Sequence, residues 1–435
     1  MKNPRKFYIS LFLLFILGSG IIGYNNTFNH HDKDEDSLSH LLTFFQMMHR
    51  VKQNYVNVDK VSNQKLIYGA LKGMMNSLDE YSEFYEPVRS ERITIETEGK
   101  YGGLGIYVRE VKDGLQIQHV IKDTPAERCG LQKNDIIQKV DNKSFKNFNQ
   151  KQSLQLLKGA EGSEVLLSIF RPDEEKTLEI KSIREIIKIP SISNSKVLDN
   201  KIAYMRILQF NRPAAGQFYK ELNTFINDKD CQALIIDLRN NPGGLLHSAI
   251  SICSNFVKEG ELLVFTEGRN NEIKERYHSL SGQKFNKLPI VILINAHSAS
   301  ASELMATCLK DYKVAVSIGE KSYGKGSVQS FLSLNDGSSA KFTSAYYFTP
   351  GKHLIHGNGV EPDLSIKLTK KEKLDFQKGF TAYETEEHVD KVLQSAHGIL
   401  SHYLVENQEK FSFKNLLQST KNYQRKDLIN NDFTK

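Results

Sequence analysis

The sequence has few of the residues that bind metals or cross-link a small domain. It contains four cysteines in 435 residues, Cys129, Cys231, Cys253 and Cys308, and their spacing matches no metal-ligand pattern. Three of them lie inside apolar segments, which is typical of buried free thiols. An exported protein could form a disulfide, but spacing alone does not pair the cysteines. The sequence therefore predicts no metal and no organic cofactor.

Blocks of basic residues with interleaved aromatic residues are also absent. The net charge of +7 is spread along the chain, which argues against a role in nucleic-acid binding. The content of 39% hydrophobic and 25% charged residues excludes a disordered tail. A chain of this length can form two or three domains with sizeable cores.

The N-terminus has the pattern of an export signal. Lys2, Arg5 and Lys6 precede residues 7–24, an uncharged apolar run whose length lies between that of a cleaved signal and that of a membrane-spanning helix. Gly18-Ser19-Gly20 is a weak cleavage site, and no cysteine follows that could accept a lipid. We expect an uncleaved anchor, residues 1–24, in the inner or cytoplasmic membrane, with the rest of the chain on the periplasmic or extracytoplasmic side. The alternative is a cleaved, soluble periplasmic form.

A serine motif lies between a predicted strand and a predicted helix. Residues 288–295 form an apolar run typical of a buried strand, and residues 299–310 have a helical pattern. Ser300 would lie at the turn between them, where the first helical amides, including that of Ala301, point at whatever Ser300 attacks. The alternative is that these serines are ordinary N-cap residues and that Glu303 completes a capping box.

A lysine motif follows the helix and another apolar run, residues 314–318. A strand, a helix and a second strand would bring the two motifs to one edge of a sheet. Lys325 is flanked by Gly324 and Gly326, which allow close packing around its side chain. A desolvated lysine has a lowered pKa, and in its neutral form it can take the proton of a serine hydroxyl. Alone, a Gly-Lys-Gly sequence would mark a solvated turn.

A third motif follows the apolar run 233–239, where a buried strand would end in Asn240-Asn241-Pro242-Gly243-Gly244. Either Gly243 or Gly244 could present its amide to a developing oxyanion, and Gly244 is our first choice. A tight structural loop is the alternative.

Taken in order, Asp-Leu-Arg-Asn-Asn-Pro-Gly-Gly, Ser-Ala-Ser-Ala-Ser-Glu and Gly-Lys-Gly-Ser-Val-Gln resemble the motifs of the C-terminal processing peptidases, or tail-specific proteases. The resemblance implies that Ser300 is the nucleophile, Lys325 the general base and Gln329 the residue that orients the lysine. It also implies an oxyanion hole formed by Ala301 and the Gly243-Gly244 turn. The implied fold class is α/β, with a mixed-sheet core of the crotonase and Clp-protease spiral type.

Two residues near these motifs need a separate interpretation. Four residues span about 13 Å in a strand but about 6 Å in a helix. The segment must therefore bend if Gln329 is to reach Lys325. His297 is adjacent to the serine motif, but a general base is defined by geometry rather than by sequence position. We interpret His297 as structural.

Residues 97–172 resemble a PDZ domain that ends with a strand at residues 165–171. Tyr101-Gly102-Gly103-Leu104-Gly105 would be the loop whose amides receive a peptide carboxylate, and the following strand would pair with the peptide backbone. A nucleotide-binding loop is less consistent, because no Lys-Ser or Lys-Thr pair follows the glycines. Arg171 is a candidate relay between this domain and the core, although a solvated arginine at the end of a strand is the simpler interpretation.

The remaining regions are a polar linker (25–36), a helical N-terminal region (37–96), the core (173–368) and a charged helical extension (369–435). The segment Leu78-Asp79-Glu80-Tyr81-Ser82 also resembles the family. Apolar stripes in the N-terminal region would pack on the core or form a homodimer. The C-terminal extension would be a solvated subdomain or a dimerisation element.

These features predict an exported serine endopeptidase with a Ser-Lys dyad and an inserted PDZ domain. It would process or degrade proteins whose free, apolar C-termini bind the PDZ domain, and docking of the tail would align Lys325 and Gln329 with Ser300. The alternative is a catalytically inactive, membrane-anchored PDZ scaffold. A trypsin-like exported protease is excluded by the order of the domains and by the absence of a Gly-Asn-Ser-Gly-Gly motif.

Overall fold

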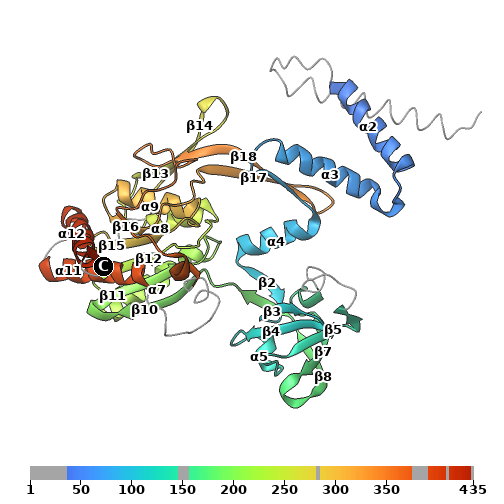
Figure 1. Cartoon of the computed structure of the whole chain (residues 1–435), viewed down its shortest axis with the longest axis horizontal. Coiled ribbons are helices and arrows are strands. Elements are labelled where there is room, and N and C mark those ends of the chain that lie inside the picture. Colours follow the sequence, from blue (N-terminus) through green and yellow to red (C-terminus); the bar gives the residue numbers. More distant parts are fainter. Residues whose placement is uncertain (1–36, 146–155, 281–284, 375–389, 408–410, 433–435) are drawn as a thin grey trace, which may run out of the picture. The chain divides into compact units, whose positions relative to one another are not determined.

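The computed structural model describes residues 37–145, 156–280, 285–374, 390–407 and 411–432 (Figure 1). The predicted anchor and linker, residues 1–36, lie outside the described residues. Among the helices that are described, none has the length and apolar character needed to cross a membrane. The chain divides into two compact units, residues 1–71 and 72–435.

The described part of the first unit, residues 37–71, is mainly helical, as predicted for this region. It contains α2 (Ser37–Asn54), the short 3-10 helix η1 (Val58–Lys60) and the start of α3 (Asn63–Asn76). Several apolar side chains of α2 are exposed, among them Leu38, Leu41, Leu42, Phe45 and Met47. Homodimerisation through this region stays a prediction.

The core of the second unit is a six-stranded sheet in the order β10 (Ile192–Leu198), β11 (Ile202–Ile207), β12 (Ala233–Asp237), β15 (Ile290–Ile294), β16 (Ala315–Gly319) and β19 (Leu364–Ser365). Within this sheet, the neighbouring strands β11, β12, β15, β16 and β19 are parallel, and β10 is antiparallel to β11. Every residue of β12, β15 and β16 is buried, because helices cover both faces of the sheet. The three strands predicted from apolar runs are therefore confirmed.

One face of this sheet packs against α7 (Ala214–Asn223), α8 (Leu246–Cys253) and α9 (Ala301–Asp311). The other face packs against α11 (Lys391–Glu406) and α12 (Phe413–Asp432). Ile399 and Leu400 of α11 are fully buried together with Val291 of β15. The expectation of a solvated C-terminal subdomain is therefore wrong, since an apolar stripe of α11 completes the core.

A second sheet is built around β18 (Ser339–Phe348), which pairs with β1 (Glu83–Tyr85), β13 (Leu262–Glu267) and β17 (Ser327–Ser333). Strand β14 (Ile273–His278) pairs with β13. Strand β1 lies inside the region predicted to be helical and precedes α4 (Pro87–Glu98). Its antiparallel pairing with β18 brings the N-terminal part of the unit beside β18, the strand that follows β17 and the lysine motif.

The PDZ sheet has the order β3 (Ile106–Val111), β4 (Gly114–Val120), β5 (Ile136–Val140), β7 (Glu164–Arg171) and β8 (Lys176–Ile183). Strand β6 (Lys143–Ser144) pairs with β5, and α5 (Pro125–Arg128) follows β4. Strand β8 pairs with β7 along its whole length, so the sheet continues past the predicted last strand. The fold class is confirmed as α/β, with a mixed-sheet core, a mainly β PDZ domain and helical regions at both ends.

Arg171 is not a solvated residue at the end of a strand. Its side chain is 10% exposed. Its Nε lies 2.8 Å from Oδ1 of Asp135, its Nη2 lies 2.9 Å from Oδ2, and Nη2 also donates to the carbonyl of Gly130 at 2.8 Å. The hydrogen bonds to Asp135 raise the pKa of Arg171. This pair is internal to the PDZ domain and holds β7 against the segment before β5.

Candidate active site

Ser300 lies at a strained turn between β15 and α9. Its backbone angles are φ 56° and ψ −115°, a conformation that costs a non-glycine residue about 1–3 kcal/mol and is typical of functional turns. The two neighbouring serines of the motif do not cap the helix. Ser298 Oγ donates to the carbonyl of Leu238 at 2.8 Å, and Ser302 Oγ donates to that of Asn241 at 3.0 Å. Both bonds hold the Ser300 turn against the segment that follows β12.

The Gly243-Gly244 turn lies directly beside Ser300. A Cβ atom placed on Gly243 would lie 2.8 Å from Cβ of Ser300 and 3.0 Å from the amide nitrogen of Ala301. The Gly243 amide donates to Oδ1 of Asn241 at 2.8 Å. For the amides of Gly244 and Ala301, by contrast, no acceptor is recorded within the described residues. Each of the two loops therefore carries one amide without a recorded acceptor, Gly244 in one and Ala301 in the other.

Glu303 connects the serine turn to the lysine loop. Its carboxylate is fully buried, and its Oε2 accepts from the amides of Ser300 and Lys325, each at 2.8 Å. Its Oε1 accepts from the amide of Gly324 at 2.6 Å and from the hydroxyl of Ser322 at 2.5 Å. The bond to Ser300 is the one expected for a capping box, but the other three reach across to residues 322–325 of the lysine loop.

Tyr347 on β18 makes a second connection. Its hydroxyl lies 2.9 Å from the carbonyl oxygen of Ser300 and 2.5 Å from that of Lys325. The side chain is 2% exposed, so water does not compete for these contacts. Ser300 and Lys325 are thus fixed relative to each other through their backbones.

Lys325 is partly buried in the loop before β17. Its pKa is lowered to about 8, first by burial and then by the nearby Lys341 ammonium, against the opposing charges of Asp79 and Glu303. Its Nζ lies 5.1 Å from the centre of the Tyr81 ring. A substantial fraction of Lys325 is therefore neutral in mildly alkaline solution.

Gln329 lies on β17, next to a register irregularity in the pairing with β18. Its Nε2 donates to Ser327 Oγ at 2.9 Å and to Thr343 Oγ1 at 3.3 Å. The structure thus places the Gln329 amide on hydroxyl groups of β17 and β18 and not on Lys325.

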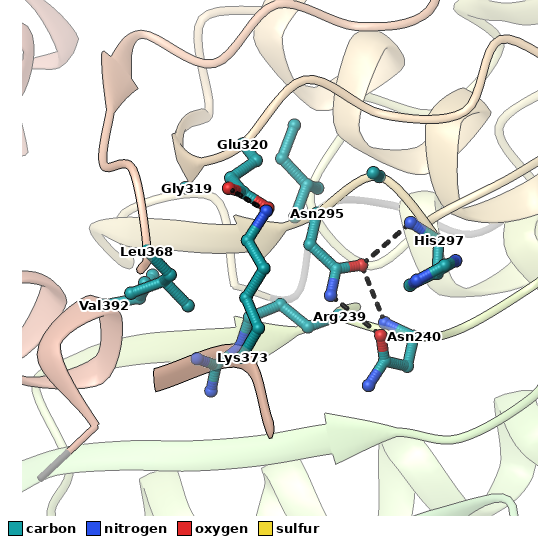
Figure 2. A pocket seen from close by; sticks show the side chains of 11 residues that line it. Arg239, Asn240, Asn295, His297, Gly319, Glu320, Leu368, Lys373 and Val392 are labelled. Atoms are coloured by element: carbon teal, nitrogen blue, oxygen red, sulfur yellow. Dashed lines mark hydrogen bonds and ion pairs between the residues drawn. The ribbon is translucent and has the colours of Figure 1, made fainter. Parts of the chain in front are cut away.

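His297 lies at the carboxyl ends of the parallel strands, where Asn295 binds two loops together (Figure 2). Asn295 Oδ1 accepts from the amides of Asn240 at 3.0 Å and His297 at 3.1 Å, and Asn295 Nδ2 donates to Asn240 Oδ1 at 2.8 Å. The His297 ring lines a pocket together with Arg239, Lys373 and Glu320. The structure records no hydrogen bond between this ring and Ser300.

The predicted carboxylate loop of the PDZ domain is only partly a loop. Tyr101, Gly102 and Gly103 belong to β2 (Lys100–Gly103), which pairs with β9 (Glu185–Lys188). A Cβ atom on Gly102 would lie 2.0 Å from the carbonyl oxygen of Gly159, so glycine is needed there for a close approach of two backbones. Only Leu104 and Gly105 form the turn into β3, with Gly105 at φ 85°.

The four cysteines are free thiols, and all but Cys129 are buried. Among the described residues, no group of three or more histidine, cysteine, aspartate or glutamate side chains is arranged to hold a metal ion.

Two family models match this chain. Residues 201–366 match peptidase family S41, and residues 102–182 match a PDZ domain. A carboxy-terminal-processing protease of Bartonella bacilliformis is 33% identical over 345 residues, which cover 79% of this chain and 78% of that protein. A probable CtpA-like serine protease of Staphylococcus aureus is 34% identical over 319 residues, which cover 73% of this chain and 63% of the relative.

Among solved structures, the photosystem II D1 C-terminal processing protease is 25% identical to this chain with a TM-score of 0.43. The match covers 75% of this chain and 92% of that protein.

Proposed function

Because the chain belongs to peptidase family S41 and is a serine-type peptidase, we propose that Ser300 is its nucleophile and Lys325 its general base. The observation that supports this assignment is the double connection between the two residues. Glu303 accepts from both of their amides, and the Tyr347 hydroxyl contacts both of their carbonyls. A nucleophile and a base must be held at a fixed separation for proton transfer.

In the proposed reaction, neutral Lys325 Nζ takes the proton of the Ser300 hydroxyl while Oγ attacks the scissile carbonyl. The amides of Ala301 and Gly244 receive the oxyanion, and each such donor contributes about 3 kcal/mol to the stability of the transition state. The lysine ammonium then returns its proton to the leaving amine. Water, deprotonated by Lys325, hydrolyses the acyl-enzyme and restores the Ser300 hydroxyl.

The PDZ domain would select substrates by their C-terminal tails. Strand β3 stands at the end of the PDZ sheet order, so its outer edge can pair with an extended peptide. The turn at Leu104 and Gly105 would then receive the terminal carboxylate through backbone amides. Substrates would be proteins or peptides with free, apolar C-termini. Docking would also turn the Gln329 amide from Ser327 and Thr343 toward Lys325.

We also propose that the chain is exported and anchored by residues 1–24, with the peptidase on the extracytoplasmic side. The support is the basic stretch followed by the apolar run in the sequence. N-terminal sequencing of the protein recovered from the membrane fraction tests this. An intact N-terminus is expected, and a new N-terminus after Gly20 would show cleavage instead.

The enzymatic proposal is tested with wild-type chain and with Ser300→Ala and Lys325→Ala variants. The substrate is an unfolded protein with an apolar C-terminus, in a free form and a C-terminally amidated form. We expect cleavage by wild type only, and weaker cleavage of the amidated form. Lys258→Ala, which changes an exposed lysine, should cleave like wild type.

If none of the proteins cut the substrate although all of them bind its tail, the inactive PDZ scaffold is the better description. Equal cleavage of the free and amidated forms would contradict C-terminal recognition but not the Ser-Lys chemistry.

A further inference from the structure

Tyr81 lies over the side chain of Lys325 although it comes from a distant part of the chain. The pairing of β1 with β18 places the segment before β1 beside the lysine loop. Asp79 Oδ1 fixes the turn in this segment by accepting from the amides of Tyr81 at 2.8 Å and Ser82 at 2.7 Å. The Tyr81 ring centre is then 5.1 Å from Lys325 Nζ, within the distance at which an ammonium is attracted by the face of an aromatic ring.

The ring has neighbours that restrict its position. Its centre lies 5.8 Å from that of the His356 ring in an edge-on arrangement, and the His356 ring lies 4.7 Å from that of Tyr346. The lysine loop packs against the same place, since a Cβ atom on Gly326 would lie 2.6 Å from the amide nitrogen of His356. Tyr81 and Lys325 are therefore held against a common surface.

Within the described residues, no hydrogen bond is recorded for Lys325 Nζ. The charged groups around it are Lys341 on β18, Asp79 before β1 and Glu303 on α9. Glu303 is already engaged by four donors, and Gln329 is engaged by Ser327 and Thr343. The Tyr81 ring, by contrast, directly faces the amine, which lies over it at 5.1 Å from the ring centre.

An aromatic face attracts an ammonium more strongly than a neutral amine, because the attraction depends on the charge. The ring therefore stabilises the state that appears when the lysine has accepted a proton. We propose that Tyr81 is a positioning residue of the peptidase reaction, whose ring face orients Lys325 and stabilises the ammonium formed as Ser300 is deprotonated. This inference rests on the proposed role of Lys325 as the general base.

The test compares Tyr81→Leu with Tyr81→Phe in the full chain. Leucine keeps the site apolar but removes the aromatic face, whereas phenylalanine keeps the face and removes only the hydroxyl. For Tyr81→Leu we expect the rising limb of the kcat/KM profile to move to lower pH by about half to one unit, because the ammonium has lost a stabilising contact. We also expect its plateau to fall about three- to tenfold, while Tyr81→Phe stays within about twofold of wild type.

A second readout does not depend on catalysis. The rate at which acetic anhydride labels Lys325, followed by mass spectrometry across pH, reports the pKa of its amine directly. The labelling midpoint should move to lower pH in Tyr81→Leu and stay in place in Tyr81→Phe. A circular dichroism melt of each variant establishes that it is folded at the assay temperature.

The possible outcomes separate this inference from the function on which it rests. If Lys325→Ala still cleaves, the proposed base is wrong. If Lys325→Ala is inactive but the Tyr81→Leu profile and labelling midpoint match wild type, only the role of Tyr81 is wrong. Equal effects of the two Tyr81 variants would also overturn it, since the hydroxyl and not the ring face would then be responsible.

Discussion

Oε2 of Glu303 lies 2.8 Å from the amide nitrogen of Lys325, and the same oxygen accepts from the amide of Ser300 at 2.8 Å. Burying a carboxylate is costly unless its charge is satisfied by hydrogen bonds. Four donors satisfy this one. The helix that follows Ser300 thereby also holds the loop that carries Lys325.

Replacement of Glu303 by glutamine should disable the enzyme more than it unfolds it. A glutamine has one acceptor oxygen, and its amide group would face some of the four donors. We expect kcat to fall at least about a hundredfold, and the free energy of unfolding to fall by about 2–4 kcal/mol. Peptide cleavage and urea unfolding measure the two effects. The control is Glu272→Gln, which changes an exposed glutamate and should alter neither; a Glu303→Gln enzyme with normal kcat would contradict the role given to this carboxylate.

Tyr347→Phe removes the hydroxyl that contacts both motifs and keeps the buried ring. The loss of such a hydrogen bond costs about 1 kcal/mol, and looser placement of the two loops should lower kcat about tenfold with little change in KM. Steady-state kinetics on a peptide substrate measures this. Tyr346→Phe, on the neighbouring and more exposed tyrosine, is the matched control. Equal kcat values for the two variants would show that the Tyr347 hydroxyl does not hold the loops.

Gly243→Ala should abolish cleavage, because the new methyl group would meet Ser300 Cβ at 2.8 Å and the Ala301 amide at 3.0 Å. Gly243 also has φ 102°, so the substitution strains the backbone. Gly260→Ala separates the two effects, since Gly260 has φ 80° but nothing within 4 Å of an added Cβ.

Both glycine variants should lose about 1–2 kcal/mol of stability from backbone strain, but only Gly243→Ala should lose activity. Thermal unfolding and peptide cleavage are measured side by side. Normal cleavage by Gly243→Ala would place the oxyanion elsewhere than at this turn.

Arg171→Gln tests whether Arg171 is a relay or a structural residue of the PDZ domain. The substitution leaves Asp135 buried without its partner, which should cost about 3–5 kcal/mol, and tail binding should weaken as the domain loosens. Arg92→Gln, in an exposed pair with Glu96, should change stability by less than about 0.5 kcal/mol. Fluorescence anisotropy with a labelled tail peptide and urea unfolding measure these effects. A variant with normal stability and tail binding but altered cleavage would indicate a relay instead.

The secondary structure around the site could be predicted because it depends on local pattern. Continuous apolar runs predicted β12, β15 and β16, which are buried on both faces. The helical pattern of residues 299–310 predicted α9. The predicted helix began two residues early, at residue 299, whereas α9 begins at Ala301. The helical pattern could not indicate the hydrogen bond from the Ala299 amide to the carbonyl of Asn241 at 3.0 Å, which keeps Ala299 out of the helix.

The contacts that join the loops could not be predicted because they connect residues far apart in the chain. For Glu303, the sequence predicted only a local capping box. Nothing in its position along the chain indicates that its carboxylate accepts hydrogen bonds from amides of the lysine loop. Tyr81 precedes β1, and Tyr347 lies on β18. The register of the pairing between these two strands is set only in the folded sheet. Strand β8 of the PDZ domain was missed because its side chains alternate between exposed and half-buried, without a strong apolar run.

The most direct test of the Ser-Lys assignment is the pH dependence of kcat/KM for the wild-type enzyme. Only neutral Lys325 can accept the serine proton, so activity should fall tenfold per pH unit below the pKa of about 8 and level off above it. Lys325→Ala should remain inactive across the whole range. A profile with its midpoint near 6.5, the usual pKa of histidine, or a cleaving Lys325→Ala variant would contradict the lysine as general base.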